Sequence, residues 1–250
     1  MRKFISGLSM ALTMFTVIPL PCRWDDNARG MQLALLPVAG AIIGGLWALG
    51  VWIINLVNMP SLLGGALLVA IPNVMSGCIH LDGLMDTSDA IFSWRTLEER
   101  RRILKDSRVG AFAVITLAIV LMIYFGAASS ITFSKLSIVS LFTRPVATRC
   151  CSSYAIFICK PLEEGGYFNL SRKGIAGYLV ILAVFLASAA CLSWLVCGIK
   201  GLIPIGSALA GYVTALFYAK SSLKGMGGDI AGFSMTLGEL CGVVSLALIG

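Results

Sequence analysis

Apolar residues in this 250-residue chain gather into runs close to the length that a helix needs to cross a bilayer. The runs show none of the strand-period alternation that a membrane barrel requires. The pattern therefore predicts an all-α, polytopic membrane helix bundle that forms one integral membrane domain over residues 1–250. We expect about seven transmembrane helices, at residues 31–54, 61–79, 110–129, 136–158, 175–197, 202–219 and 233–249.

Two further helices are expected outside these spans. The first lies in the N-terminal stretch "MRKFISGLSMALTMFTVIPLPC", which starts like a signal peptide but has Pro21 where a cleavage site needs a small residue. We interpret it as an interfacial or re-entrant helix that ends at Pro19 and Pro21. The second is a cytoplasmic amphipathic helix in "TLEERRRILKDSRVG", where Thr96 and Glu99 have the spacing of a capping box.

Composition supports a membrane protein. Hydrophobic residues make up 58% of the chain and charged residues only 12%, whereas a soluble domain carries about 25% charged residues. The eight cysteines are scattered without paired metal-ligand spacing, which argues against zinc or a disulfide framework. We expect the lipid bilayer and small molecules as partners, and no nucleic acid.

Basic residues predict the orientation. If the N-terminus is cytoplasmic, Lys135 and Lys200 are the only Lys or Arg residues outside the spans that fall on the far side. This asymmetry follows the positive-inside rule. It places three polar loops, at about 80–109, 160–174 and 220–232, on the cytoplasmic face, and we expect the active site there.

The first of these loops contains "HLDGLMDTSDA". Asp82, Asp86 and Asp89 are spaced at i, i+4 and i+7, which places them on one face if the segment is helical. Their charges repel unless something neutralises them, and Mg²⁺ prefers carboxylate and phosphate oxygens. Three acids in a solvated loop are the alternative. His80, the one histidine, would orient a carboxylate or bind phosphate, or it is an interfacial residue without a chemical role.

The same loop ends in "KDSRVG", where an acid lies among cations. Asp106 is a candidate metal ligand from this second position. Lys105, Ser107 and Arg108 beside it are candidates for phosphate binding. A basic helix lying among lipid headgroups explains most of the other arginines in this region.

The third loop contains "KGMGGDIAGFSMTLGEL". Its glycines allow backbone N–H groups to turn toward an anion at Gly228, with Asp229 held close and Lys224 nearby. A flexible glycine-rich loop is the alternative reading of this stretch.

Three charges fall within the predicted spans, where ionisable groups are costly and usually functional. Arg144 and Arg149 lie in one span and Glu239 in the last. One of the arginines, for which we take Arg144, would reach a substrate phosphate. The alternative is an ion pair with Glu239.

The motifs "HLDGLMDTSDA", "RRILKDSRVGAF" and "GMGGDIAGFSMTLGEL", in this order, resemble the cobalamin synthase family. Among the departures, Gly77-Cys78 stands where the family commonly has paired glycines, and Thr236 where it often has glutamate. The resemblance implies a Mg²⁺-dependent phosphotransferase of the prokaryotic cytoplasmic (inner) membrane. Such an enzyme joins adenosylcobinamide-GDP to α-ribazole or its 5′-phosphate, giving adenosylcobalamin or its 5′-phosphate and GMP. This is the final assembly of the cobalamin nucleotide loop.

Combining the motifs with this chemistry gives a set of candidate site residues. The metal ligands would be Asp82, Asp86 and Asp106, holding one or two Mg²⁺ ions against the pyrophosphate. The catalytic residues would be His80, with Asp89 or Asp229 as the general base. The residues that bind substrate or phosphate would be Lys105, Ser107, Arg108, Arg144, Lys224 and Gly228.

Two other functions are compatible with clustered acids in a membrane protein. A CDP-alcohol-type phosphotransferase acting on a lipid also uses aspartates, but its signature orders them differently. A secondary transporter usually binds its ion on broken helices near the bilayer midplane, whereas we expect these acids in loops at one face. The formation of a homo-oligomer, or an association with other nucleotide-loop assembly enzymes, stays open.

Overall fold

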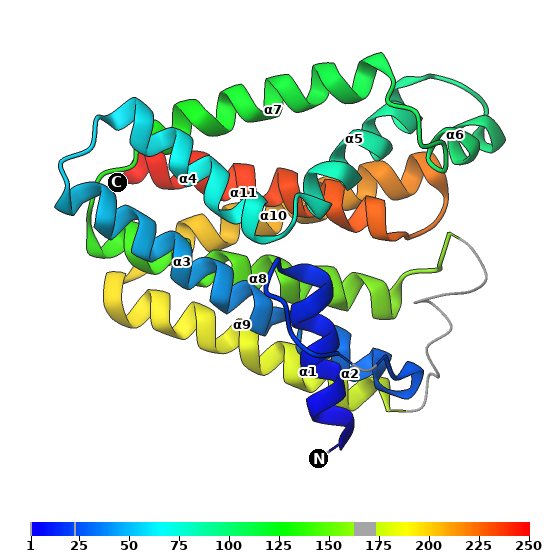
Figure 1. Ribbon diagram of the computed structural model, residues 1–250, viewed down its shortest axis with the longest axis horizontal. Helices are drawn as coiled ribbons and strands as arrows, with labels where there is room; N and C mark the ends of the chain where they lie inside the picture. The colour runs from blue at the N-terminus through cyan, green and yellow to red at the C-terminus, as the bar shows by residue number, and fades with distance from the viewer. Residues whose placement is uncertain (1, 23, 163–173) are drawn as a thin grey trace.

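The computed structural model describes residues 2–22, 24–162 and 174–250. Within them the chain is helical, and an isolated bridge between Pro161 and Met226 is the only strand-like pairing. This confirms the prediction of an all-α fold (Figure 1). The elements are α1 (Arg2–Phe15), the 3-10 turn η1 (Asp26–Ala28), α2 (Arg29–Ala34), α3 (Leu36–Leu56), α4 (Ser61–Met75), α5 (Ile79–Phe92), α6 (Leu97–Ile103), α7 (Ala111–Ser129), α8 (Lys135–Ile158), α9 (Ile175–Cys197), α10 (Ile199–Leu223) and α11 (Gly228–Ile249).

The described residues contain five helices that are long and apolar enough to cross a membrane, namely α3, α7, α9, α10 and α11. A sixth span is present if α4 and α5, which meet at a bend of 89°, form one broken span. The predicted count of seven is not confirmed. The remaining predicted span, 136–158, became α8, which carries Arg144 and Arg149 in its middle.

Helix α8 is enclosed by other helices, which explains how it tolerates polar residues. It contacts α3, α9, α10 and α11. Its hydroxyl groups find partners there: the Thr143 and Ser193 hydroxyls lie 2.9 Å apart, and Ser153 Oγ donates to the Leu33 carbonyl at 2.6 Å. Polar groups inside a bilayer need such internal partners because no water is available.

The connections that carry the predicted site lie at one end of the bundle. In Figure 1 the α5–α6–α7 segment and the turn between α10 and α11 are at the right, opposite the α3–α4 connection. The predicted loop 160–174 falls largely outside the described residues. Its first part is tied to the α10–α11 turn, because the Met226 amide donates to the Lys160 carbonyl at 2.9 Å. The described parts of these connections therefore lie at one end of the bundle.

The two helices expected outside the spans are present. Helix α1 ends at Phe15, before the prolines. Helix α6 begins at the predicted capping box, in which the Glu99 amide donates to Thr96 Oγ1 and the Thr96 amide to the Glu99 carboxylate. Helix α6 ends at Ile103, so the following residues up to Gly110 form a connection rather than a longer helix.

Candidate active site

The acid-rich motif begins at a break between α4 and α5. Gly77 and Cys78 both have left-handed backbone angles, with φ of 64° and 58°. Two consecutive residues of this kind end α4 and turn the chain through 89°, and α5 begins at Ile79. Consequently Asp82, Asp86 and Asp89 lie on a helix that starts at this break, not in the loop that the sequence predicted.

Helix α5 packs closely against the start of α11. A methyl group placed on Gly83 would lie 2.7 Å from the Asp229 carbonyl oxygen and 3.2 Å from the Gly232 Cα atom. The absence of a side chain at Gly83 therefore lets the two backbones touch. This contact joins residues separated by more than half of the 250-residue chain.

The contact between α5 and α11 groups the acids from two motifs. The charges of Asp82, Asp89 and Asp229 all act on Asp86, and the charge of Asp82 acts on Asp229. Neither Asp82, Asp86 nor Asp229 forms an ion pair within the described residues. The result is a cluster of negative charge that no cation among the described residues balances through an ion pair.

Beside this cluster lies a cavity of about 230 Å³. Four predicted site residues line it: His80 and Asp82 from α5, and Gly228 and Asp229 from α11. Its other walls come from α1, α2, α3 and α8 and from further residues of α5 and α11, and they are mainly apolar. They are formed by Met14, Phe15, Leu33, Leu36, Ile79, Ser152, Ile156, Ala231, Gly232 and Met235.

The N-terminus of α11 opens at this cavity. Its N-cap residue, Gly227, has no side chain to bond the first amides, and the first intrahelical bond runs from the Ala231 amide to the Gly227 carbonyl. The amides of Gly228, Asp229 and Ile230 precede that bond, and such groups are suited to anions because they carry the positive end of the helix dipole. The predicted anion-binding backbone at Gly228 is thus a helix start rather than a loose loop.

The residues predicted from "KDSRVG" lie outside the cavity. Arg108 donates to both oxygens of Asp106, at 2.7 to 3.1 Å. These hydrogen bonds lower the pKa of Asp106 to about 2, so its carboxylate stays charged at physiological pH. Lys105, Ser107 and Arg108 are exposed. The structure does not bring Asp106 together with Asp82 and Asp86.

Asp89 is occupied by a structural contact. Its carboxylate accepts hydrogen bonds from the backbone amides of Gly110 and Ala113. It therefore caps the N-terminus of α7 and ties α5 to the next span. Of the two candidates for the general base, only Asp229 lines the cavity.

Arg144 is fully buried and is not among the residues that line the cavity. Its Nε atom lies 3.5 Å from the Glu239 carboxylate, and its guanidinium lies 4.6 Å from the centre of the Trp47 ring. Arg144 therefore forms the ion pair with Glu239 that was the alternative to binding a substrate phosphate. Lys224, also predicted to bind phosphate, caps the end of α10 and is exposed.

In the described parts of the chain, no three or more His, Cys, Asp or Glu side chains are arranged to hold a metal ion. This does not disfavour Mg²⁺, which is usually held by one or two carboxylates together with waters and substrate phosphates. The pair Asp82 and Asp86 fits that donor chemistry, since both are carboxylates on one helical face and neither forms an ion pair with another described residue.

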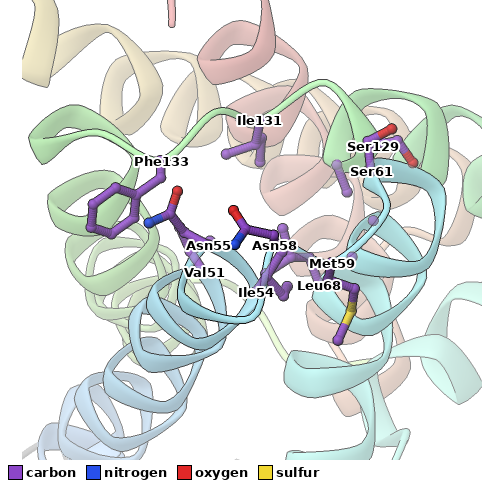
Figure 2. Close-up of a pocket in the computed structure, with 13 residues that line it drawn as sticks. Val51, Ile54, Asn55, Asn58, Met59, Ser61, Leu68, Ser129, Ile131 and Phe133 are labelled. Atoms are coloured by element: carbon purple, nitrogen blue, oxygen red, sulfur yellow. The ribbon is translucent and has the colours of Figure 1, made fainter.

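A second pocket of about 310 Å³ lies at the opposite end of the bundle, where α3 meets α4 and α7 ends (Figure 2). Asn55, Asn58, Ser129 and Phe133 are among the residues that line it. None of the predicted site residues does, so this pocket is not the candidate active site.

No motif in the sequence indicated the apolar walls of the cavity. Met14 and Phe15 come from α1, which we expected to lie at the interface. Their role follows only from the way α1 folds back on the bundle, where the Val17 amide donates to the Met75 carbonyl at 2.9 Å. Met and Phe are common throughout the chain, and nothing local distinguishes these two.

Comparison with known proteins adds independent information. The family model for cobalamin-5-phosphate synthase matches residues 7–247. A protein named adenosylcobinamide-GDP ribazoletransferase from Clostridium perfringens (strain ATCC 13124) is 35% identical over 253 residues and covers both chains completely. Proteins with the same name from Clostridium botulinum (strain Eklund 17B) and Geobacillus sp. (strain WCH70) are 35% and 30% identical, over 99% and 93% of this chain. No solved structure matches.

These matches also bear on the alternative that the chain is a secondary transporter. We disfavoured that function because the acids were expected in loops, yet Asp82 and Asp86 lie on a helix next to a break. Location alone therefore does not exclude a transporter. The match to the cobalamin-5-phosphate synthase family is what argues against a transporter.

Proposed function

The chain belongs to the cobalamin-5-phosphate synthase family, and we propose that it assembles the cobalamin nucleotide loop in the cavity between α5 and α11. In this reaction adenosylcobinamide-GDP is joined to α-ribazole or its 5′-phosphate, and GMP leaves. The observation that carries the proposal is that Asp82 and Asp229, from distant motifs, meet beside the free amides of α11 at an apolar cavity.

The pyrophosphate of adenosylcobinamide-GDP would bind at the start of α11. The first amides of this helix donate to phosphate oxygens, and the helix dipole favours their negative charge. The apolar walls suit the aromatic base of α-ribazole, because they bury its rings without leaving polar groups unpaired. The site thus has one polar end and one apolar end, as its two substrates require.

Mg²⁺ would be held by Asp82 and Asp86. When bound, the ion supplies neutralisation of the negative charge that gathers on the pyrophosphate oxygens. Without a cation the two carboxylates would repel the phosphates that α11 attracts. This expectation differs from the sequence prediction in leaving out Asp106, which is ion-paired with Arg108 and does not line the cavity.

Asp229 would act as the general base. It accepts the proton of the ribazole hydroxyl as that oxygen bonds to the cobinamide-linked phosphorus, and the bridging oxygen leaves with GMP. The reaction needs positioning and charge neutralisation and no covalent intermediate with the protein. Asp89 is unsuited to the role because both its oxygens are bound to the amides of α7.

We further propose that the acid-bearing end of the bundle faces the cytoplasm in a prokaryotic inner membrane. The basic residues of α6 and of the neighbouring connections support this orientation. It gives the enzyme access to water-soluble nucleotide substrates. A thiol-reactive, membrane-impermeant probe should label a cysteine placed at Glu98 in inverted vesicles and not in intact cells.

The experiment that tests the proposal is turnover by the purified full-length protein. The enzyme, adenosylcobinamide-GDP, α-ribazole and Mg²⁺ should yield GMP, and a chelator should stop the reaction. Asp82→Asn should abolish GMP release while its thermal unfolding stays close to that of the unsubstituted protein. Glu98→Gln, which changes an exposed acid on α6, is the matched control. Normal turnover by Asp82→Asn would contradict the assignment.

A further inference from the structure

A buried polar chain leads from the centre of the bundle to the cavity. Glu239 on α11 accepts a hydrogen bond from Thr148 Oγ1 at 2.8 Å and one from Arg149 Nη1 at 3.3 Å. Arg149 is 2% exposed and Glu239 is 8% exposed, so both are withdrawn from solvent. Buried charges of this kind are stable only when paired and hydrogen-bonded.

Arg149 extends this chain to the cavity. Its Nη2 atom lies 3.5 Å from Nε2 of His80. A guanidinium has only donor N–H groups, so Nε2 can only accept there and the ring proton of His80 must be on Nδ1. In the described residues Nδ1 has no hydrogen-bond partner. His80 lines the cavity together with Asp82 and Asp229, and it also lines a smaller pocket with Arg149 and Glu239, so this residue links the two.

The backbone of His80 is held as well. Thr236 Oγ1 donates to the His80 carbonyl at 3.1 Å, and Gly232 allows α11 to approach that carbonyl closely. The ring and the main chain of His80 are thus fixed from two sides, by α8 and by α11. A side chain held this way points in one direction before any substrate arrives.

We propose that Arg149 is a positioning residue, which holds the His80 ring so that its Nδ1–H donates to a phosphate oxygen of the substrate. Glu239 fixes the guanidinium by accepting from its Nη1 atom, and Thr148 in turn holds the Glu239 carboxylate. The inference rests on the proposed function in naming phosphate as the acceptor. The assignment of the ring proton to Nδ1 does not depend on that function, because it follows from the contact between Arg149 and Nε2.

The contacts explain why arginine is required at this position. Nη1 donates to both the Pro145 carbonyl, at 3.2 Å, and Glu239, while Nη2 donates to His80. A lysine keeps the charge but presents a single nitrogen without the planar fork, so it cannot hold these three acceptors in fixed directions. Gly40 on α3 makes room for the side chain, since a methyl group there would lie 2.8 Å from Arg149 Cδ.

The first test reads the ring proton directly. His80 is the only histidine in the chain, so protein grown with ¹⁵N-labelled histidine reports on this ring alone. The nitrogen chemical shifts should show the Nδ1–H form in the unsubstituted protein and a mixture of the two neutral forms in Arg149→Met. A dominant Nε2–H form in the unsubstituted protein would overturn the proposal, whatever the activity.

The second test is a double-substitution cycle on turnover. Arg149→Met should lower kcat by about 10- to 100-fold, with a smaller change in KM, because a misdirected donor loses its transition-state contact. Arg149→Lys, which keeps a cation beside Glu239 and so protects the fold, should lose kcat to a similar extent. In a His80→Ala background either change should cost less than about twofold more.

Arg144→Met is the matched control, because Arg144 also pairs with Glu239 but does not contact His80. Its effect on kcat should be the same in both backgrounds. An Arg149 effect that persisted in full without His80 would overturn the proposal. Failure of the unsubstituted protein to release GMP would instead count against the proposed function, and the spectroscopic result would stand.

Discussion

The substitution Gly83→Ala probes the contact on which the candidate site depends. The added methyl group would lie 2.7 Å from the Asp229 carbonyl oxygen and 3.0 Å from its Cα atom. Both are backbone atoms of α11, so no side chain can rotate away. Ordinary contact begins at 3.4 Å, so the helices must separate by about 0.7 Å at this point. Overpacking of this kind costs about 1–3 kcal/mol of stability.

The effect on catalysis should exceed the effect on folding. A shift of this size moves Asp229 and the α11 amides away from Asp82, and misplacement by about 1 Å can cost about 100-fold in rate. We expect kcat for GMP release to fall by about 10- to 100-fold, while the protein remains folded in detergent. The assay is steady-state turnover by the purified protein, alongside a thermal unfolding curve.

Gly45→Ala on α3 is the control, because no atom lies within 4 Å of the added methyl group. It adds the same methyl group to a helix and should leave both activity and unfolding nearly unchanged. If Gly83→Ala retained turnover within about twofold of the unsubstituted protein, the close approach of α5 and α11 would not be what assembles the site.

Three further predictions concern the framework around the site. Cys78→Gly should raise stability by about 1 kcal/mol in thermal or denaturant unfolding, because Cys78 has a left-handed backbone that glycine adopts without strain; a loss of stability would contradict the reading of this break. Asp89→Ala should destabilise the protein by about 0.5–2 kcal/mol through loss of the α7 cap, and normal unfolding would show that the cap is dispensable. Arg101→Ala should cost about 1–3 kcal/mol because Arg101 donates to two carbonyls at the end of α10; Arg102→Ala is its control, and equal unfolding of the two variants would refute the difference.

The Arg101 contacts change an expectation drawn from the sequence. In the sequence Arg101 is one of several arginines on a basic helix that is expected to lie among lipid headgroups. In the structure it joins α6 to the end of α10, a few residues before Asp229. We still expect Asp82 to dominate catalysis, but Arg101 contributes to holding the α10–α11 turn.

Local sequence determined much of this protein. Hydrophobic runs predicted the helical membrane bundle, and the spacing of Thr96 and Glu99 predicted the capping box of α6, because both depend on neighbours within one or two turns. The motif order identified the family. The spacing of Asp82, Asp86 and Asp89 is that of one helical face, and these residues do lie on a helix. The segment as a whole was nevertheless predicted to be a loop.

Tertiary structure decided what these residues contact. The break at Gly77 and Cys78 sets the direction of α5, and the missing side chain of Gly83 brings Asp229 beside Asp82. Packing also assigned Asp89 to the cap of α7, and it turned Arg149 toward His80. Spacing along the chain states which residues share a helical face, but a contact between residues 83 and 229 depends on how two helices pack. That information lies in many weak contacts spread over the bundle, and no single motif contains it.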